Sequence, residues 1–221
     1  TSQPHNPTIS QPGSFRTTEL RAELRFAPGE TFINTKQRRL KVNLDAPVFT
    51  LGHTMGFKGL LGGDYKYNYT EASIYKRFWM NSWGKVDIYV RGGIQWDKVP
   101  FPLLCMPATN LSYIIQDQTF QLINNMEFLN DRFVSADVSW DFNGKLFNRI
   151  PLIKKLKWRE CIGVNVLWGA LSDKNNPASS NYTDKNLFYF PGHFMPDGSY
   201  ECNTYTMDPK TPYVELRLGV H

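Results

Sequence analysis

Alternation between apolar and polar side chains recurs in five segments of this 221-residue chain. In the segment Glu19–Phe26, charged residues occupy every odd position and apolar residues occupy every even one. Because successive side chains of a β-strand point to opposite faces, each segment predicts a strand with one apolar and one polar face. The other four segments are 40–48, 86–96, 134–142 and 214–220. The chain is therefore predicted to be all-β.

Four further segments are weaker strand candidates, because their alternation is less regular. Together with the first five they make about nine strands of about 9–13 residues, longer than the ~5–6 residues usual in soluble sheets. The 16 Gly and 14 Pro residues are spread along the chain, which argues against long helices. The weaker candidates are 49–57, 67–80, 120–128 and 158–170.

Two architectures use strands of this kind. A soluble β-sandwich packs the apolar faces of two sheets together, whereas an outer-membrane β-barrel turns its apolar face to lipid and its charged face to the lumen. Strand length favours the barrel, because a tilted strand needs about 9–11 residues to cross the hydrocarbon. The six Trp residues lie near predicted strand ends, where the aromatic girdles of barrels are found. The pattern favours an antiparallel transmembrane β-barrel.

A more specific signal comes from an ordered series of motifs. The motifs are GGIQWDKVPFPLL (92–104), NLSY (110–113), FQLINNMEFLNDRF (120–133) and FNGKLFNRIPLIKKLKWRE (142–160). In this order, they resemble the barrel region of a family of Gram-negative outer-membrane proteins of undefined function. Members of that family carry a carboxypeptidase-regulatory-like β-sandwich ahead of the barrel, and the barrel is distantly similar to the superfamily of BamA and TamA. The resemblance covers nearly all of 15–221 and implies the outer membrane of a Gram-negative bacterium as the location.

The chain is expected to consist of a polar lead-in at 1–14 and a barrel region at 15–221, with a long connection at 171–212. Members of the resembled family continue with about two more strands, and bacterial single-chain barrels usually have an even strand count. We therefore expect the C-terminal part of a larger barrel, and a complete barrel of about 8–10 strands is the alternative.

The order of the predicted strands leaves a conflict about their connections. Short connections at 46–47, 81–84 and 129–131 fall on one side, which is usually periplasmic in such barrels. Counting strands then places 171–212 on the same side, whereas the family resemblance implies an extracellular loop. Either a strand pair lies within 171–212, with 186–190 and 200–206 as candidates, or one strand assignment is wrong.

The charged face is the feature most open to a functional interpretation. Both signs of charge alternate along it, which favours cross-strand ion pairs that fill the lumen over a hydrated path selective for one sign. The residues expected to face the lumen are Glu19, Arg21, Glu23, Arg25, Lys41, Asp45, Asp87, Arg91, Glu127, Asp137, Asp141, Glu215 and Arg217.

A basic cluster at 154–159 lies between apolar residues and a predicted lipid-facing strand. This setting favours contact with lipid phosphates at the membrane edge, and it argues against nucleic acid as a partner. The expected partners are outer-membrane lipid and other outer-membrane or surface proteins. The candidate anchors at the membrane edge are Trp83, Trp96, Lys154, Lys155, Lys157 and Trp158.

No catalytic or metal-binding template is present in the sequence, so no catalytic residue, metal or cofactor is predicted. The four histidines are isolated, and the three cysteines have no spacing that fits zinc. Cys105 and Cys202 both lie in predicted connections, where they could pair with each other or remain free thiols.

The expected function is non-enzymatic. The superfamily resemblance implies a role in assembly or export of outer-membrane proteins. The alternative is a passive channel or surface-interaction barrel with a charge-filled lumen, and the third possibility is a barrel enzyme that acts on lipid or peptide.

Overall fold

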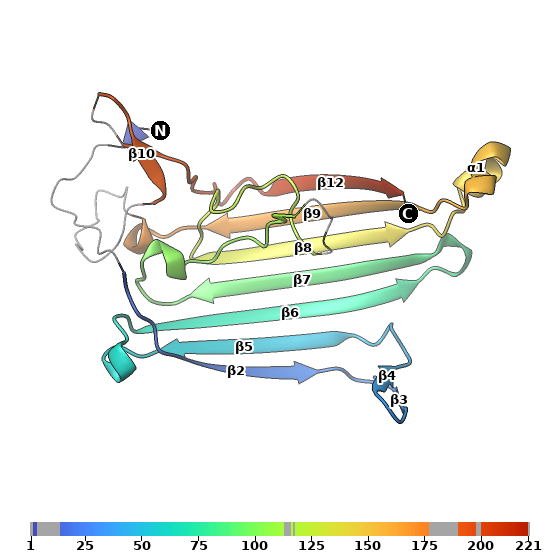
Figure 1. Cartoon of the computed structure of the whole chain (residues 1–221), viewed down its shortest axis with the longest axis horizontal. Helices are drawn as coiled ribbons and strands as arrows, with labels where there is room; N and C mark the ends of the chain where they lie inside the picture. The colour runs from blue at the N-terminus through green and yellow to red at the C-terminus, as the bar shows by residue number, and fades with distance from the viewer. Residues whose placement is uncertain are drawn as a thin grey trace.

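A seven-stranded antiparallel sheet dominates the computed structural model, which describes residues 2–3, 14–112, 116, 118–176, 190–197 and 200–220 (Figure 1). Its strand order is β12-β9-β8-β7-β6-β5-β2, so each strand pairs with its neighbours along the chain. The prediction of an all-β chain is confirmed. The strands are β2 (Glu19–Phe26), β5 (Val48–Gly56), β6 (Tyr67–Trp79), β7 (Lys85–Gln95), β8 (Arg132–Asp141), β9 (Glu160–Ala170) and β12 (Tyr213–Val220).

Smaller elements lie at the two ends of the sheet (Figure 1). A hairpin joins β3 (Phe32–Asn34) to β4 (Arg39–Lys41), and a small sheet joins β1 (Ser2–Gln3), β11 (Tyr200–Cys202) and β10 (Gly192–Phe194). No helix in the described ranges is long and apolar enough to span a membrane. The helices are η1 (Leu60–Gly62), η2 (Asn81–Trp83), η3 (Phe101–Leu103), η4 (Phe147–Arg149), α1 (Pro151–Leu156) and η5 (Asp173–Asn175).

The predicted strand at 40–48 is wrong. Only Arg39–Lys41 is extended there, as β4, and the sheet strand β5 begins at Val48. Asn43 turns the chain back onto the hairpin, since its Oδ1 accepts a hydrogen bond from the Thr31 N–H at 2.9 Å. Pro47 follows and has no N–H to donate to a neighbouring strand.

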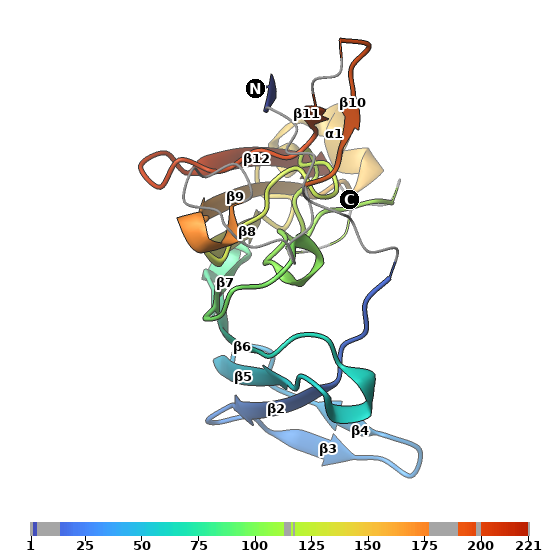
Figure 2. The same cartoon turned by 90° about the vertical axis from the view of Figure 1, so that its left-hand side faces the viewer.

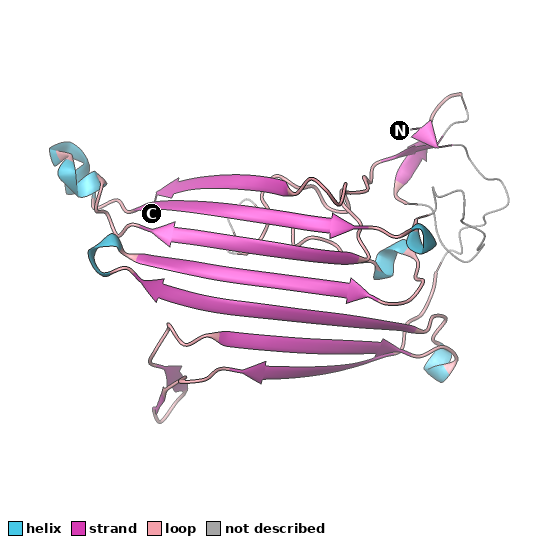
Figure 3. Cartoon of the chain, turned by 180° about the vertical axis from the view of Figure 1, so that it is seen from behind, coloured by secondary structure: helices cyan, strands magenta, loops and turns pink. Residues whose placement is uncertain are grey.

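The predicted strand at 120–128 is also wrong. The N–H groups of Gln121 and Leu122 donate to the carboxylate of Glu215 rather than to a neighbouring strand. This segment belongs to a longer connection, residues 97–131, which we call the cover segment. Its described residues lie against one face of the sheet, in front of the strands in Figure 1 and behind them in Figure 3.

Because these two predicted strands are not part of the sheet, the longest connection no longer falls on the same side as the short connection 80–84. Connections 27–47, 80–84 and 142–159 share one end of the sheet, which we call the α1 end. The opposite end, which we call the long-loop end, faces the viewer in Figure 2. It carries 57–66, 96–131 and 171–212, so the longest connection lies opposite the short connection 80–84.

One face of the sheet is apolar and exposed. The side chains of Leu24 and Leu218 are 73% and 81% exposed. A row of apolar residues, each paired in register with the next, crosses all seven strands on this face. The row is Phe26, Phe49, Ile74, Val90, Ala136, Val166 and Val214.

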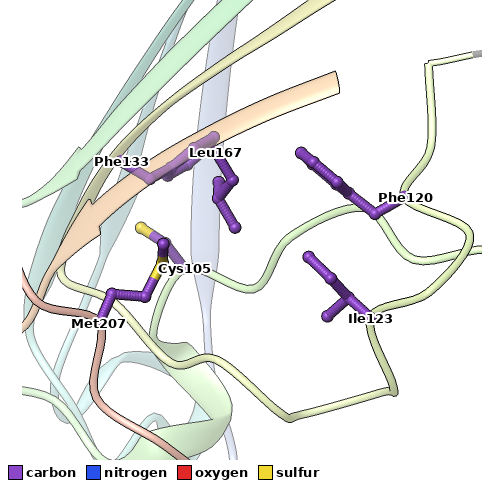
Figure 4. Close-up of a cluster of buried hydrophobic side chains, with 6 residues drawn as sticks. All are labelled: Cys105, Phe120, Ile123, Phe133, Leu167 and Met207. Carbon is purple, nitrogen blue, oxygen red and sulfur yellow. The ribbon is translucent and has the colours of Figure 1, made fainter. Parts of the chain in front are cut away.

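The buried core lies on the other face, between the sheet and the cover segment (Figure 4). Phe133 of β8 and Leu167 of β9 pack there with Phe120 and Ile123 of the cover segment. Cys105 and Met207 complete this cluster, and a second cluster contains Tyr67, Val99, Leu104, Leu129 and Phe190. The arrangement covers part of the polar face and leaves the apolar face uncovered.

Candidate functional site

The polar face of the sheet carries a series of short ion pairs. Arg77 Nε lies 2.5 Å from Asp87 Oδ1, and Arg91 Nη2 lies 2.8 Å from Glu71 Oε2. Tyr75 donates to Asp87 at 2.9 Å, and Tyr69 donates to Glu71 at 2.8 Å. Because the arginines and carboxylates come from neighbouring strands, the pairs link the strands through their side chains as well as their backbones.

Most of the residues predicted to face a lumen share this polar face. Arg21 pairs with Glu23 along β2 at 3.0 Å, and Lys85 Nζ lies 3.9 Å from Asp141. The predicted residues on this face are Glu19, Arg21, Glu23, Arg25, Asp87, Arg91, Asp137, Asp141, Glu215 and Arg217.

Three of the residues predicted to face a lumen lie outside the strands of the seven-stranded sheet, so they are not part of its polar face. Lys41 is in β4 and contacts Glu30 at 2.8 Å, and the carbonyl of Asp45 accepts a hydrogen bond from Lys76 at 2.7 Å. Glu127 lies in the cover segment, where it accepts the Asn124 N–H at 2.7 Å. All three were assigned to a face through strands that do not join the sheet.

Glu215 holds the cover segment against the sheet. Its side chain is 2% exposed, and Oε1 accepts the N–H groups of Gln121 at 2.9 Å and of Leu122 at 2.6 Å. Beside it, Asn165 Nδ2 donates to the carbonyl of Thr119 at 2.9 Å. Buried carboxylates are costly unless they are hydrogen-bonded, so these contacts account for the burial of Glu215.

A second set of contacts joins the two longest connections at the long-loop end. The buried carboxylate of Asp131 accepts hydrogen bonds from the N–H of Ser172, at 3.0 Å, and from its hydroxyl. Asn175 Oδ1 accepts the Val99 N–H at 2.9 Å. Asn165, Asp131 and Asn175 were not among the predicted site residues, because their partners are more than 40 residues away in the sequence.

Two pockets of about 300 Å³ open on the polar face. The first lies between β2, β5, β6, β7 and the cover segment, and its lining includes Arg21, Glu71 and Arg91. Gln95, 2% exposed, also lines it, and its side-chain amide has no hydrogen-bond partner among the described residues. The second is lined by charges of both signs, among them Asp87. This mixture does not favour selection of one ionic sign.

Neither a metal site nor a site for thiol chemistry is assembled among the residues that the structure describes. No group of three or more His, Cys, Asp or Glu side chains there could hold a metal ion. Cys105 and Cys202 are free thiols. Burial raises the pKa of the Cys105 thiol to about 12, and the nearby carboxylate of Asp131 adds to this. A thiol with so high a pKa is a poor nucleophile.

The predicted membrane-edge anchors divide between the two ends. Trp83 lies in η2 at the α1 end, together with Lys154 and Lys155 of α1 and the adjoining Lys157 and Trp158. Trp96 follows β7 at the long-loop end, where its Nε1 donates to Thr70 Oγ1 at 2.9 Å. Both ends of the strands therefore carry exposed tryptophan.

A family model described as "Family of unknown function (DUF5686) C-terminal domain" matches residues 1–182. The chain belongs to this family. The matched part of the DUF5686 C-terminal domain contains β2 and β5 to β9, and β12 lies beyond it. No curated protein and no solved structure is significantly similar to the chain.

Proposed function

We propose that this DUF5686 C-terminal domain forms the wall of a transmembrane β-barrel in the outer membrane of a Gram-negative bacterium. The observation that carries this proposal is the apolar row from Phe26 to Val214, which lies on the uncovered face while the ion pairs lie opposite. In water, a single sheet would bury its apolar face and expose its charges. The reverse arrangement suits a sheet with hydrocarbon on one side and a polar lumen on the other.

Strand length supports the same proposal. The strands β6, β7, β8 and β9 contain 13, 11, 10 and 11 residues. A tilted strand needs about 9–11 residues to cross the hydrocarbon core. The central strands are thus long enough to span it.

The unpaired edges of β2 and β12 are evidence that further strands close the barrel. Among the described residues, β2 and β12 each pair with one strand only, so each has an unpaired edge. Unpaired backbone groups in hydrocarbon cost several kcal/mol each, and lipid does not replace the missing hydrogen bonds. We therefore propose that these strands are part of a larger closed barrel.

Side chains would occupy much of the interior of such a barrel. The ion pairs of Arg77, Arg91 and Arg217 lie across its polar face, and Glu215 holds the cover segment there. These contacts support a stiff, charge-filled lumen over an open, hydrated path.

Within this architecture, the proposed role is a non-enzymatic one in assembly or export of outer-membrane proteins. Its support is the distant similarity of the barrel region to the superfamily of BamA and TamA, so it rests on analogy. A passive channel or surface-interaction barrel with a charge-filled lumen is the second candidate, and the ion pairs across the polar face favour a lumen of that kind. The proposed partners are outer-membrane lipid and other outer-membrane or surface proteins.

Membrane integration is tested first. The protein should need detergent for purification and should migrate faster on unboiled than on boiled gels, as closed barrels do. A monodisperse protein in buffer without detergent, with no bound lipid or detergent belt, would contradict the proposal.

The role is tested by depletion of the protein in its native cell and comparison of outer-membrane proteomes. Loss of particular barrels or surface lipoproteins supports assembly or export. An unchanged proteome together with altered solute uptake supports the channel, and a step conductance in planar bilayers would strengthen that outcome.

A further inference from the structure

Charge is divided unequally between the two ends of the sheet. The three connections at the α1 end contain ten basic and two acidic residues, which gives a formal charge of +8. The described residues of the three connections at the long-loop end include five basic and eight acidic ones, a formal charge of −3. The seven strands carry no net formal charge. The net charge of +5 for the whole chain is therefore concentrated at one end.

The connection 142–159 accounts for most of this difference, with six basic residues and no acidic one. Lys154, Lys155 and Lys157 are exposed, and α1 buries no residue. Leu152 and Leu156 are also exposed, by 78% and 54%. A short segment that directs both lysine and leucine side chains outward suits the boundary between lipid headgroups and acyl chains.

An aromatic cluster continues this surface onto the sheet. The rings of Trp140 and Phe142 stack with centroids 4.4 Å apart, and Trp83 lies 6.5 Å from each. Lys145 Nζ lies 3.8 Å from the centroid of the Trp83 ring and donates to Ser82 Oγ at 2.9 Å. Trp140 pairs in register with Ile162, so the cluster adjoins the apolar face of β9. Tryptophan at such a boundary marks the headgroup level of a membrane.

We propose that the α1 end binds the phosphate groups of anionic glycerophospholipids and thereby sets the orientation of the protein in the membrane. This inference rests on the proposed membrane-embedded barrel. Basic residues near an anionic leaflet are attracted to it, whereas the acidic long-loop end is repelled. The connections at the α1 end are also the shorter set, as at the periplasmic side of outer-membrane barrels. The lipid in question is therefore that of the periplasmic leaflet.

The experiment measures lipid preference at the protein boundary. The purified full chain is reconstituted in phosphatidylcholine vesicles and probed with spin-labelled phosphatidylglycerol and spin-labelled phosphatidylcholine. We expect a preference for phosphatidylglycerol of about twofold to fivefold that falls in high salt, since surface charge is screened. The variant Lys154→Gln/Lys155→Gln/Lys157→Gln should lose most of it.

The matched control removes three exposed basic residues from the long-loop end, as Lys58→Gln/Lys66→Gln/Lys210→Gln. It should keep the preference of the wild-type protein. The inference would be overturned if both variants lost the preference for phosphatidylglycerol equally, or if the α1-end variant kept it. A stronger preference for lipid A than for phosphatidylglycerol would also overturn it. None of these outcomes would contradict the proposed barrel. Failure of the wild-type chain to resist extraction from vesicles at high pH would overturn the barrel as well.

Discussion

Arg217 of β12 donates a hydrogen bond from Nη2 to Oδ2 of Asp137 in β8 at 2.5 Å, across the intervening strand β9. The residue of β9 paired with Arg217 is Gly163. A Cβ atom at Gly163 would lie 2.8 Å from Arg217 Nε, so any side chain there would displace the guanidinium. The ion pair between β12 and β8 therefore depends on a glycine in the strand between them.

Gly163→Ala should destabilise the protein by about 1–2 kcal/mol, because it weakens a charged hydrogen bond in a partly buried site. The control is Gly92→Ala on the apolar face, where a Cβ would meet only ordinary contacts at 3.4 and 3.6 Å. Urea unfolding in detergent measures both, and the control should change by less than about 0.5 kcal/mol. Equal effects of the two variants would contradict the role of Gly163.

Leu24→Arg and Val138→Arg should each cost about 2–4 kcal/mol in lipid if their sites lie near the membrane midplane. Leu24 is 73% exposed, so in water the same change would be nearly neutral. Arg21→Leu should cost less than either. Leu111→Arg, in the cover segment and 75% exposed, is the matched control. Unfolding from vesicles measures the loss of stability in each variant. A larger loss for Arg21→Leu than for Leu24→Arg and Val138→Arg would mean that the lipid-facing and lumen-facing sides of the sheet are exchanged.

The ion pairs of Glu30 with Arg25 and Lys41, at the α1 end, should depend on pH. Hydrogen bonds from Arg25 and then from Lys41 lower the pKa of Glu30 from 4.5 to about 2. Because the pKa is lowered on folding, the contribution is complete above about pH 4.5 and is lost as the pH falls toward 2. The difference in unfolding midpoint between the wild-type protein and Glu30→Gln should shrink over this range. A difference that stays constant from pH 5 to pH 2 would contradict the prediction.

Cys105 should resist alkylation at pH 8 in the folded protein. Its thiol is buried, with a pKa raised to about 12 by that burial, and the thiolate is the reactive form. Mass spectrometry after iodoacetamide treatment should find Cys105 unmodified until the protein is unfolded. Modification of native Cys105 as fast as of Cys202 would show that the cover segment opens readily.

Epitope insertion tests the orientation of the two ends. A tag inserted after Gly59, in the exposed turn at the long-loop end, should bind antibody on intact cells. A tag in the Asn143-Gly144 turn at the α1 end should bind only after the outer membrane is permeabilised. The opposite labelling pattern would place the basic end outside the cell.

Local alternation alone determined much of the sheet. Alternation is set by the geometry of a single strand, so the 8-residue strands β2 and β12 and the two faces of β8 could be predicted without knowledge of their partners. The same reasoning placed Arg21 and Arg217 on the polar face. It also predicted cross-strand ion pairs, because both signs of charge recur on that face.

Only the tertiary structure decided which extended segments join the sheet. The segment 120–128 looks like a strand, yet its backbone donates to Glu215, which lies 94 residues beyond Gln121 in the sequence. The pair of Arg217 and Asp137 likewise joins residues 80 apart. Contacts at such separations depend on strand order and register, and a local pattern carries neither. For the same reason, the sequence could not assign each connection to an end of the sheet. That assignment depends on the number of strands in the sheet, which is seven and not the predicted nine.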